Sequence, residues 1–478
     1  MVKITDKHKH LILIIFCCLA YLFTHYKSFQ ISFFWDDWEY MLEYKDIIWG
    51  ESLFKNVFSH HNYHVIPIIK LFYYACFRLF GYSTFPFHLV ILFSNWLMIT
   101  SCYGIVFFIA KNIRISLLLT FILSITHIYD EAILWIGASH ILIAASFFYF
   151  SLFLLLLNKK SFFYQSLFAG SVFLSFTSFS LGVFLFPFIL IGILVYKPDN
   201  RKFYFLSTVG SFCVVSLLYF IAIVLLAHTS ENNLEQAISV NLIKCIDSLI
   251  LAFKAIYYKM LPGLFNSSNR IISFIIIFLG FVGFIEAIKK KNNKNIISFF
   301  YFFSLMTLSI FIPFFGRIHM GNHVVNWERY YCFPAISFMV CLSLSVLNFL
   351  SIRVLKLHLS GKVLNIIISF FMLFLLIISC NKKMSNYPKE SLQKQFEFEL
   401  ITSVDKYFSS SKGDIPLKIK DREVKTIFCF KMKASNYFKV FLKKEVYKKI
   451  NFCNVTSKDF EKFLMYNKYY STYYLVKT

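Results

Sequence analysis

The sequence predicts an all-α polytopic membrane protein with a small soluble α+β domain at its C-terminal end. Of its 478 residues, 58% are hydrophobic and only 15% are charged, whereas a soluble domain carries about 25% charged residues. The apolar residues form continuous runs of helical length, unlike the alternating segments of roughly 10 residues that build a transmembrane barrel. The composition therefore excludes an ordinary soluble domain and predicts helices that span a membrane.

The first apolar run covers residues 11–23 and follows a short basic segment with Lys3, Lys7 and Lys9. This order is typical of a secretory signal, but no small-residue cleavage site follows the run. We therefore expect an uncleaved first span with its N-terminus in the cytoplasm.

Further apolar runs bring the total to about eleven spans of roughly 20 residues each. They cover residues 86–110, 115–129, 132–157, 162–179, 181–196, 203–227, 271–288, 296–315, 331–350 and 363–380. Polar residues at 175–180 interrupt one long apolar stretch, so we expect two spans there. Residues 1–380 then form the membrane domain.

Residues 32–85 are too polar to span and form the predicted first external loop. Lys70 and Arg78 lie eight residues apart in an apolar stretch, which places them near one face of a helix. We expect one or two amphipathic helices at the membrane interface in this loop.

The net charge of +24 is distributed as short Lys and Arg clusters between the runs and as a basic tail. Acidic loops, among them the region at residues 231–235, alternate with these clusters, so the positive-inside bias places the acidic loops and the C-terminal tail outside the cytoplasm. Residues 381–478 are expected to form a soluble basic domain, with a helix over 392–408 and a strand over 424–430. A solvated surface is the favoured interpretation of the basic tail, and contact with anionic lipid or an acidic glycan is the alternative. The expected partners are membrane lipids around the spans, and the charge distribution gives no indication of nucleic-acid binding.

The first candidate site is the stretch FFWDDWEYMLEY at residues 33–44, in which Asp36 and Asp37 lie between two tryptophans. Ionisable residues are scarce in a protein this apolar, and a carboxylate beside the membrane can act as a general base. The alternative is an acidic flank to an aromatic belt at the interface.

A second acidic pair, Asp130 and Glu131, is expected on the same side of the membrane, with Trp135 one turn further on. These residues are candidates for substrate binding. The alternative, a polar loop that ends a span, is at least as well supported.

A third cluster lies just before the span at 331–350. Arg329 can clamp a phosphate because guanidinium matches phosphate oxygens bidentately; Lys70 and Arg78 are further candidates, although interfacial snorkelling is favoured for Arg78. The accompanying candidates for substrate binding are His319, His323, Glu328 and Tyr330.

His60, His61 and His64 offer ligand types that suit a divalent metal together with the Asp36 and Asp37 pair. Their spacing fits no defined site, so polar interfacial histidines are the favoured interpretation. No cofactor is firmly predicted.

Taken together, these motifs resemble the GT-C glycosyltransferases, multi-spanning enzymes that use polyprenyl-phosphate sugars. The resemblance depends on the paired aspartates after the first span, on HVIPIIKLFYYACFRLFGYSTFPFHLV (residues 64–90), on WIGASHILIAASFFYFSLFLL (135–155) and on WERYYCFPA (327–335). It implies that Asp36 or Asp37 is the base and that Lys70, His64 or Arg329 lies near the donor phosphate. The size, composition and basic tail resemble bacterial enzymes that modify O-antigen.

The expected activity is therefore an inverting sugar transfer at the bacterial inner membrane. The donor would be a polyprenyl-phosphate-linked sugar, and the acceptor an extracytoplasmic glycan such as O-antigen. A lipid-linked glycan flippase and an O-antigen polymerase are the alternatives. A transporter should show charged residues along several spans, whereas here most ionisable residues lie between the apolar runs.

Overall fold

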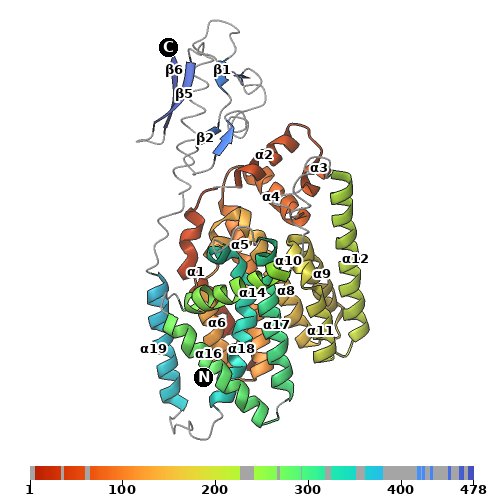
Figure 1. The fold of residues 1–478 in the computed structure, drawn as a ribbon, viewed down its shortest axis with the longest axis vertical. Helices are drawn as coiled ribbons and strands as arrows, with labels where there is room; N and C mark the ends of the chain where they lie inside the picture. Colours follow the sequence, from red (N-terminus) through yellow and green to blue (C-terminus); the bar gives the residue numbers. More distant parts are fainter. Residues whose placement is uncertain are drawn as a thin grey trace.

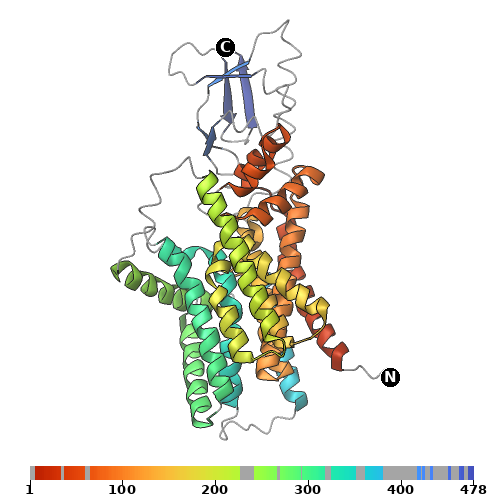
Figure 2. The ribbon, with the colours of Figure 1, turned by 90° about the vertical axis from the view of Figure 1, so that its right-hand side faces the viewer.

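The computed structural model describes residues 6–33, 37–59, 65–226, 242–265, 270–291, 293–317, 324–350 and 361–380, and six short strands between residues 417 and 477. The helices form an elongated bundle, and the strands lie beyond one end of it (Figure 1). Figure 2 shows the same arrangement from the side, with the first-loop helices at the end of the bundle that carries the strands.

Six helical segments in the described part of the chain are long and apolar enough to cross a membrane. They are His8–Gln30, Phe85–Ala110, Ile136–Leu157, Arg201–Ile221, Asn293–Phe315 and Glu328–Phe349. Three shorter apolar helices cover Ile113–Ile125, Phe186–Tyr196 and Ser369–Cys380. The chain thus has the helices of a multi-pass membrane protein, while the count of about eleven spans stays a prediction.

The chain enters the bundle through α1 (Asp6–His25) and a 3-10 turn, η1 (Tyr26–Gln30). The first loop then folds into α2 (Asp37–Ile48), α3 (Leu53–Phe58) and α4 (Pro67–Phe80). The Ser52 hydroxyl caps α3 by accepting the Lys55 N–H, and proline opens α4, where its missing N–H is tolerated. Three helices therefore occupy the loop for which the sequence predicted one or two.

The centre of the bundle is built from α5 (Phe85–Ala110), α6 (Ile113–Ile125) and α8 (Ser139–Leu157). Between α6 and α8 lie the short helix α7 (Asp130–Leu134) and a 3-10 turn, η2 (Ile136–Ala138). The apolar run predicted to span from residue 132 is therefore broken before residue 136. This break turns the 130–138 segment across the end of the bundle, where it can carry polar side chains.

The predicted interruption near residues 175–180 is confirmed as a helix break. α9 (Phe162–Ser178) ends where Phe179 adopts an extended backbone, with φ −161° and ψ 139°, and α10 (Ser180–Phe184) follows. Pro187 lies in the first turn of α11 (Phe186–Tyr196), and α12 (Arg201–Leu226) runs beside α9.

The second half of the bundle contains elements that the sequence did not predict. An amphipathic helix, α14 (Leu242–Ala255), continues through a π-turn, η3 (Ile256–Met260), into α15 (Leu261–Leu264). The long helices follow: α16 (Arg270–Lys289), α17 (Asn293–Gly316), the turn η5 (Glu328–Tyr331), α18 (Cys332–Leu350) and α19 (Gly361–Cys380). The acidic loop predicted around residues 231–235 lies outside the described residues.

Close helix packing fixes α18 in the core. A Cβ on Gly283 of α16 would lie 2.3 Å from the Ser345 carbonyl oxygen of α18, so only glycine permits this approach. On the other side, the Tyr149 hydroxyl of α8 donates to the Phe333 carbonyl, and its oxygen lies 2.6 Å from Ser337 Oγ. These contacts hold η5, at the start of α18, beside the 130–138 segment.

The C-terminal strands form three two-stranded ladders. β1 (Leu417–Lys420) and β4 (Ile450–Cys453) pair in parallel, whereas β2 (Glu423–Lys425) pairs with β3 (Lys431–Lys433), and β5 (Lys462–Asn467) with β6 (Thr472–Lys477), in antiparallel fashion. Of the strand predicted over 424–430, residues 424 and 425 lie in β2 and the others lie outside the described residues, as does the helix predicted over 392–408. A soluble α+β domain stays a prediction.

Candidate functional site

Asp37 from the first loop reaches the segment between α7 and α8. It opens α2, its side chain is fully buried, and its Oδ1 accepts a hydrogen bond from the Gly137 N–H at 2.5 Å. Because the Gly137 N–H lies in the turn that leads into α8, it belongs to the positive end of that helix. The structure thus joins one member of the first predicted acidic pair to the loop of the second pair, 100 residues away.

Gly137 is the residue that permits this contact. A Cβ at this position would lie 2.9 Å from Asp37 Oδ1 and 2.8 Å from Trp135 Nε1. Both distances are shorter than a Cβ tolerates, so any larger residue would push the carboxylate or the indole away. The sequence analysis did not single out Gly137, although the motif WIGASH contains it.

A second contact ties α4 to the same segment. The Ser139 hydroxyl donates to the Ile136 carbonyl at 2.6 Å, so the Tyr73 hydroxyl donates to Ser139 Oγ. Burial raises the pKa of the Tyr73 phenol and keeps it protonated for this bond. The first loop is therefore fastened to the 136–139 turn through both α2 and α4.

Glu131 and Arg329 form the second contact between predicted site residues. One guanidinium nitrogen of Arg329 is bonded to Glu131 Oε1, and the Arg329 backbone N–H donates to Glu131 Oε2 at 3.3 Å. Both side chains are only 13% exposed. A pair this sheltered is screened little by solvent, and removing either partner would leave a largely buried charge.

Aromatic rings enclose the Arg329 guanidinium. Its Cζ lies 4.4 Å from the centroid of the Trp327 ring, 4.9 Å from that of Trp135 and 5.4 Å from that of Tyr330. Arg317 lies against Trp327 as well, at 5.1 Å. Cation–π contacts at these distances hold guanidinium planes in place.

The sequence analysis did not identify Arg317 as a candidate. Its position was a usable signal, because Arg317 follows an apolar run just as Arg329 precedes one. It forms no ion pair with any residue that the structure describes. Among the described residues, the region around Trp327 therefore contains two guanidinium groups, of which only Arg329 is paired with a described carboxylate. Such a site favours the approach of an anion.

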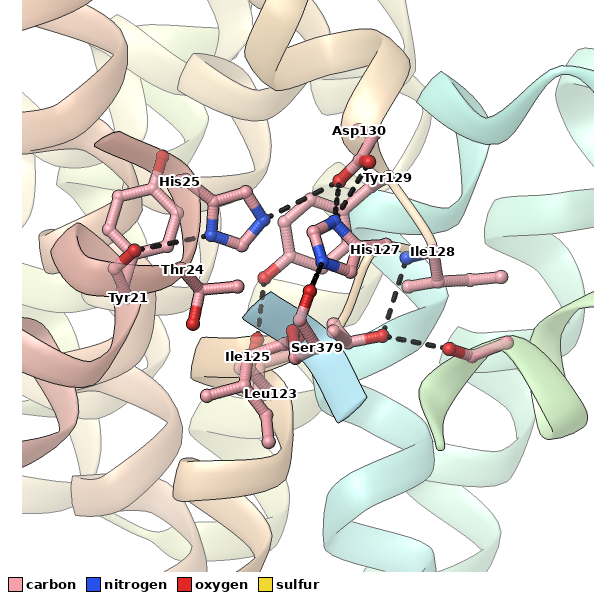
Figure 3. A network of polar contacts seen from close by, with 12 residues as sticks. Tyr21, Thr24, His25, Leu123, Ile125, His127, Ile128, Tyr129, Asp130 and Ser379 are labelled. Carbon is pink, nitrogen blue, oxygen red and sulfur yellow. Dashed lines mark hydrogen bonds and ion pairs between the residues drawn. The ribbon is translucent and has the colours of Figure 1, made fainter. Parts of the chain in front are cut away.

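Asp130 contacts different residues from its neighbour Glu131. It is buried, its two carboxylate oxygens each lie 2.9 Å from His127 Nδ1, and Oδ1 lies 3.4 Å from His25 Nε2 (Figure 3). Neighbouring residues on a helix point about 100° apart, which sends Asp130 and Glu131 to different partners. The contacts of Asp130 give no support to its predicted substrate-binding role.

Lys70 is also engaged elsewhere. Its ammonium is 1% exposed, lies 2.9 Å from Glu43 Oε2 and donates to Ser59 Oγ at 2.7 Å and to the carbonyls of Ser59 and Asn56 at 3.1 and 3.2 Å. Burial lowers the pKa of Lys70 and raises that of Glu43, while each partially offsets the shift in the other. With its three donors used, Lys70 holds α2, α3 and α4 together, and the predicted phosphate contact gains no support.

Arg78 is exposed, whereas Lys70 on the same helix is buried, and interfacial snorkelling stays the favoured interpretation of Arg78. Tyr330 is buried beside Trp327 and Phe314, and Glu328 opens η5 with a partly exposed side chain. The remaining predicted site residues lie outside the described residues: Asp36, His64, His319 and His323. The same holds for His60 and His61, which the sequence analysis considered as metal ligands together with His64 and the aspartate pair.

No family model and no curated protein matches the sequence. Among solved structures, the chain is similar to the oligosaccharyltransferase of Archaeoglobus fulgidus in its apo form, with 12% identity and a TM-score of 0.46 over 94% of this chain and 64% of that one. The complex of that protein with zinc and sulfate gives 13% identity and a TM-score of 0.44 over 92% and 62%. The chain thus spans less than two thirds of the length of these proteins, and its function has to be inferred from its own site.

Proposed function

We propose that this protein is a GT-C glycosyltransferase of the hexosyltransferase type. It would transfer a sugar from a polyprenyl-phosphate donor to an extracytoplasmic acceptor hydroxyl. O-antigen is the acceptor that the sequence resemblance favours, and the bacterial inner membrane is the corresponding location. The N-terminus would lie in the cytoplasm and the C-terminal segment outside it.

One observation carries this proposal: three segments far apart in sequence meet at Trp135. Asp37 contacts Gly137, Glu131 binds Arg329, and Trp135 lies between the two contacts, since its Nε1 is near the Gly137 Cα and its ring lies against the guanidinium. The 135–137 segment therefore contacts a carboxylate through Gly137 and a sheltered cation through Trp135. This is the pair of groups that sugar transfer from a lipid phosphate requires.

The acidic side of the site supplies the general base. A carboxylate of the Asp36 and Asp37 pair accepts the proton of the acceptor hydroxyl as the oxygen attacks the anomeric carbon. The Gly137 N–H and the start of α8 stabilise the ionised form of Asp37. Attack from the face opposite the leaving group inverts the configuration at that carbon.

The basic side receives the leaving group. As the glycosidic bond breaks, negative charge grows on the lipid phosphate, and groups placed in advance to meet this charge lower the barrier. Arg329 is held by Glu131 through one nitrogen of a guanidinium that carries five N–H donors, and Arg317 lies against the same indole. Glu131 offsets the charge of one arginine only, so the two guanidinium groups together retain a positive charge that can bind a phosphate.

The test is sugar transfer in membranes that contain equal amounts of wild-type protein, Asp36→Asn or Asp37→Asn. Loss of a general base lowers the rate by about 100- to 10,000-fold, so one of the two variants should fall by this factor. Glu39→Gln, which removes an exposed carboxylate from the same helix, is the matched control and should retain its rate.

Full transfer in both aspartate variants would remove the pair from the chemistry. Donor that crosses the membrane without cleavage of its sugar–phosphate bond would identify a flippase instead. Mass analysis of surface glycan distinguishes the proposed transferase from an O-antigen polymerase. A polymerase changes the length of the glycan chain, whereas a transferase of this type adds one sugar residue per repeat.

A further inference from the structure

Two buried histidines and Asp130 converge on one point in the interior of the bundle. His25 comes from the end of α1, His127 comes from the segment between α6 and α7, and Asp130 is the first residue of α7. One ligand atom from each residue lies within 4.8 Å of the others, and the three side chains are between 1% and 6% exposed. Figure 3 shows both imidazoles turned toward the carboxylate.

The outer nitrogen of His127 is fixed as a hydrogen-bond donor. Its Nε2 lies 3.0 Å from both the carbonyl oxygen and the Oγ of Ser379 in α19. The single hydroxyl hydrogen of Ser379 is donated to the Ile125 carbonyl at 2.5 Å, so Oγ can only accept from His127. The proton of the neutral ring is therefore on Nε2, and the Nδ1 lone pair faces Asp130.

The same reasoning applies to His25. Its Nδ1 lies 3.3 Å from the Tyr21 carbonyl oxygen, which accepts a hydrogen bond from it. Its Nε2 therefore carries the lone pair, makes no hydrogen bond with the described residues and lies 3.4 Å from Asp130 Oδ1. Two nitrogen lone pairs and a carboxylate thus face one another, which is unfavourable unless a cation lies between them.

We infer that this cluster binds a divalent transition-metal ion of the zinc class through His25 Nε2, His127 Nδ1 and the Asp130 carboxylate. Histidines that bind metals donate the other ring N–H to a backbone carbonyl or a carboxylate, as both do here. A proton can join only one nitrogen to one oxygen, whereas a metal ion meets all three ligands at once.

The distances fit this assignment. Ligand atoms about 2.1 Å from a zinc ion lie about 3.4 Å apart at the tetrahedral angle, which matches the 3.4 Å between His25 Nε2 and Asp130 Oδ1. The 2.9 Å contacts of His127 Nδ1 with Asp130 need to open by about 0.5 Å on this geometry. Three protein ligands leave a fourth position for water.

The location indicates a positioning role. The ion would join α1 to the start of α7, and the Nε2 bond of His127 to Ser379 extends the connection to α19. Asp130 directly precedes Glu131, which binds Arg329. Metal binding at the cluster therefore fixes the residue next to the proposed transfer site, without contact between the ion and substrate.

The test is metal content and thermal stability of the purified full-length protein in detergent, after chelation and reloading with zinc or cobalt(II). Wild type should retain one ion per chain and melt at a higher temperature with metal than without. His25→Ala, His127→Ala and Asp130→Asn should each lose this ion and the associated rise in melting temperature. His88→Gln is the matched control, because His88 is a buried histidine of α5 outside the cluster, and it should retain the ion.

His127→Cys tests the same site by the appearance of a new absorption band, which an unfolded variant would not produce. The thiolate would replace Nδ1 and give the cobalt(II) protein a sulfur-to-metal charge-transfer band in the near ultraviolet. The assignment would be overturned if the His25→Ala, His127→Ala and Asp130→Asn variants all retained one ion per chain, or if the wild type retained none. In either case protonation of the histidines, and not a metal ion, would balance the Asp130 carboxylate. Neither result bears on the Asp37 and Arg329 transfer site, which is tested separately.

Discussion

Lys70 and Arg329 are two cations that the sequence analysis selected as phosphate-binding candidates, and the fold surrounds them differently: Lys70 is buried, and Arg329 is 13% exposed. Around Lys70, α2 and α3 supply a carboxylate, a hydroxyl and two carbonyls, so the ammonium is fully occupied. Around Arg329, the described residues supply aromatic rings, one carboxylate and a second arginine. What decides whether a buried cation can receive a ligand is therefore the number of acceptors that the fold already provides.

The largest effect on transfer is expected for Arg329→Gln. Removing one group that meets developing negative charge lowers turnover by about 100- to 1,000-fold, and the loss also leaves Glu131 without its partner. The double variant Glu131→Gln with Arg329→Gln separates these effects, because it removes the unpaired carboxylate and should recover thermal stability but no transfer. Recovery of transfer in the double variant would assign Arg329 a structural role like that of Lys70.

A comparable loss is expected for Gly137→Ala. The added methyl group would lie 2.9 Å from Asp37 Oδ1 and 2.8 Å from Trp135 Nε1, so it displaces both sides of the site at once. A misplacement of about 1 Å can lower an enzymatic rate by about 100-fold. Gly170→Ala is the control, since a Cβ there meets no atom within 4 Å. Equal turnover in the two variants would show that the Asp37 contact with Gly137 is not needed.

Arg317→Gln tests the second guanidinium group of the site. A hydrogen bond to a charged group contributes about 1.5–3 kcal/mol, so the KM for the lipid-linked donor should rise by about 10- to 100-fold. Because Arg317 forms no ion pair with the described residues, the melting temperature should change little. A fall in stability with an unchanged KM would contradict a ligand-binding role.

The smallest effect on transfer is expected for Lys70→Met, and its effect on stability should be large. Removing one partner of a buried pair costs about 3–5 kcal/mol, because the other charge is left unpaired. The folded fraction should still transfer sugar with the wild-type KM, and Glu43→Gln combined with Lys70→Met should recover part of the stability. A raised KM in correctly folded Lys70→Met would restore the phosphate-binding prediction.

The sequence predicted the helices well because a continuous apolar run of helical length has few alternatives in a membrane protein. The runs at 86–110, 203–227, 296–315 and 331–350 correspond to α5, α12, α17 and α18. The failures occur where a run meets a polar segment: the run from residue 132 begins two turns too early, and α14 was missed because its apolar residues cover one face only.

The partners within the site could not be predicted. Periodicity places Lys70 and Asp130 on helix faces, but it does not show that Glu43 or His25 faces them. The Glu131 bond to Arg329 joins residues 198 apart, and the His127 bond to Ser379 joins residues 252 apart. The one available signal for the histidines was position, since ionisable residues at the ends of spans are expensive unless they are paired.

The most direct test of the account is equilibrium binding of polyprenyl phosphate to detergent-solubilised wild type, Arg317→Gln and Lys70→Met. The lipid phosphate is the shared part of donor and product, so its affinity reports the cation site without any chemistry. The account predicts that Arg317→Gln weakens binding by at least about 10-fold, the loss of one charged hydrogen bond, while Lys70→Met binds as wild type does. Weakened binding in Lys70→Met with normal binding in Arg317→Gln would contradict it.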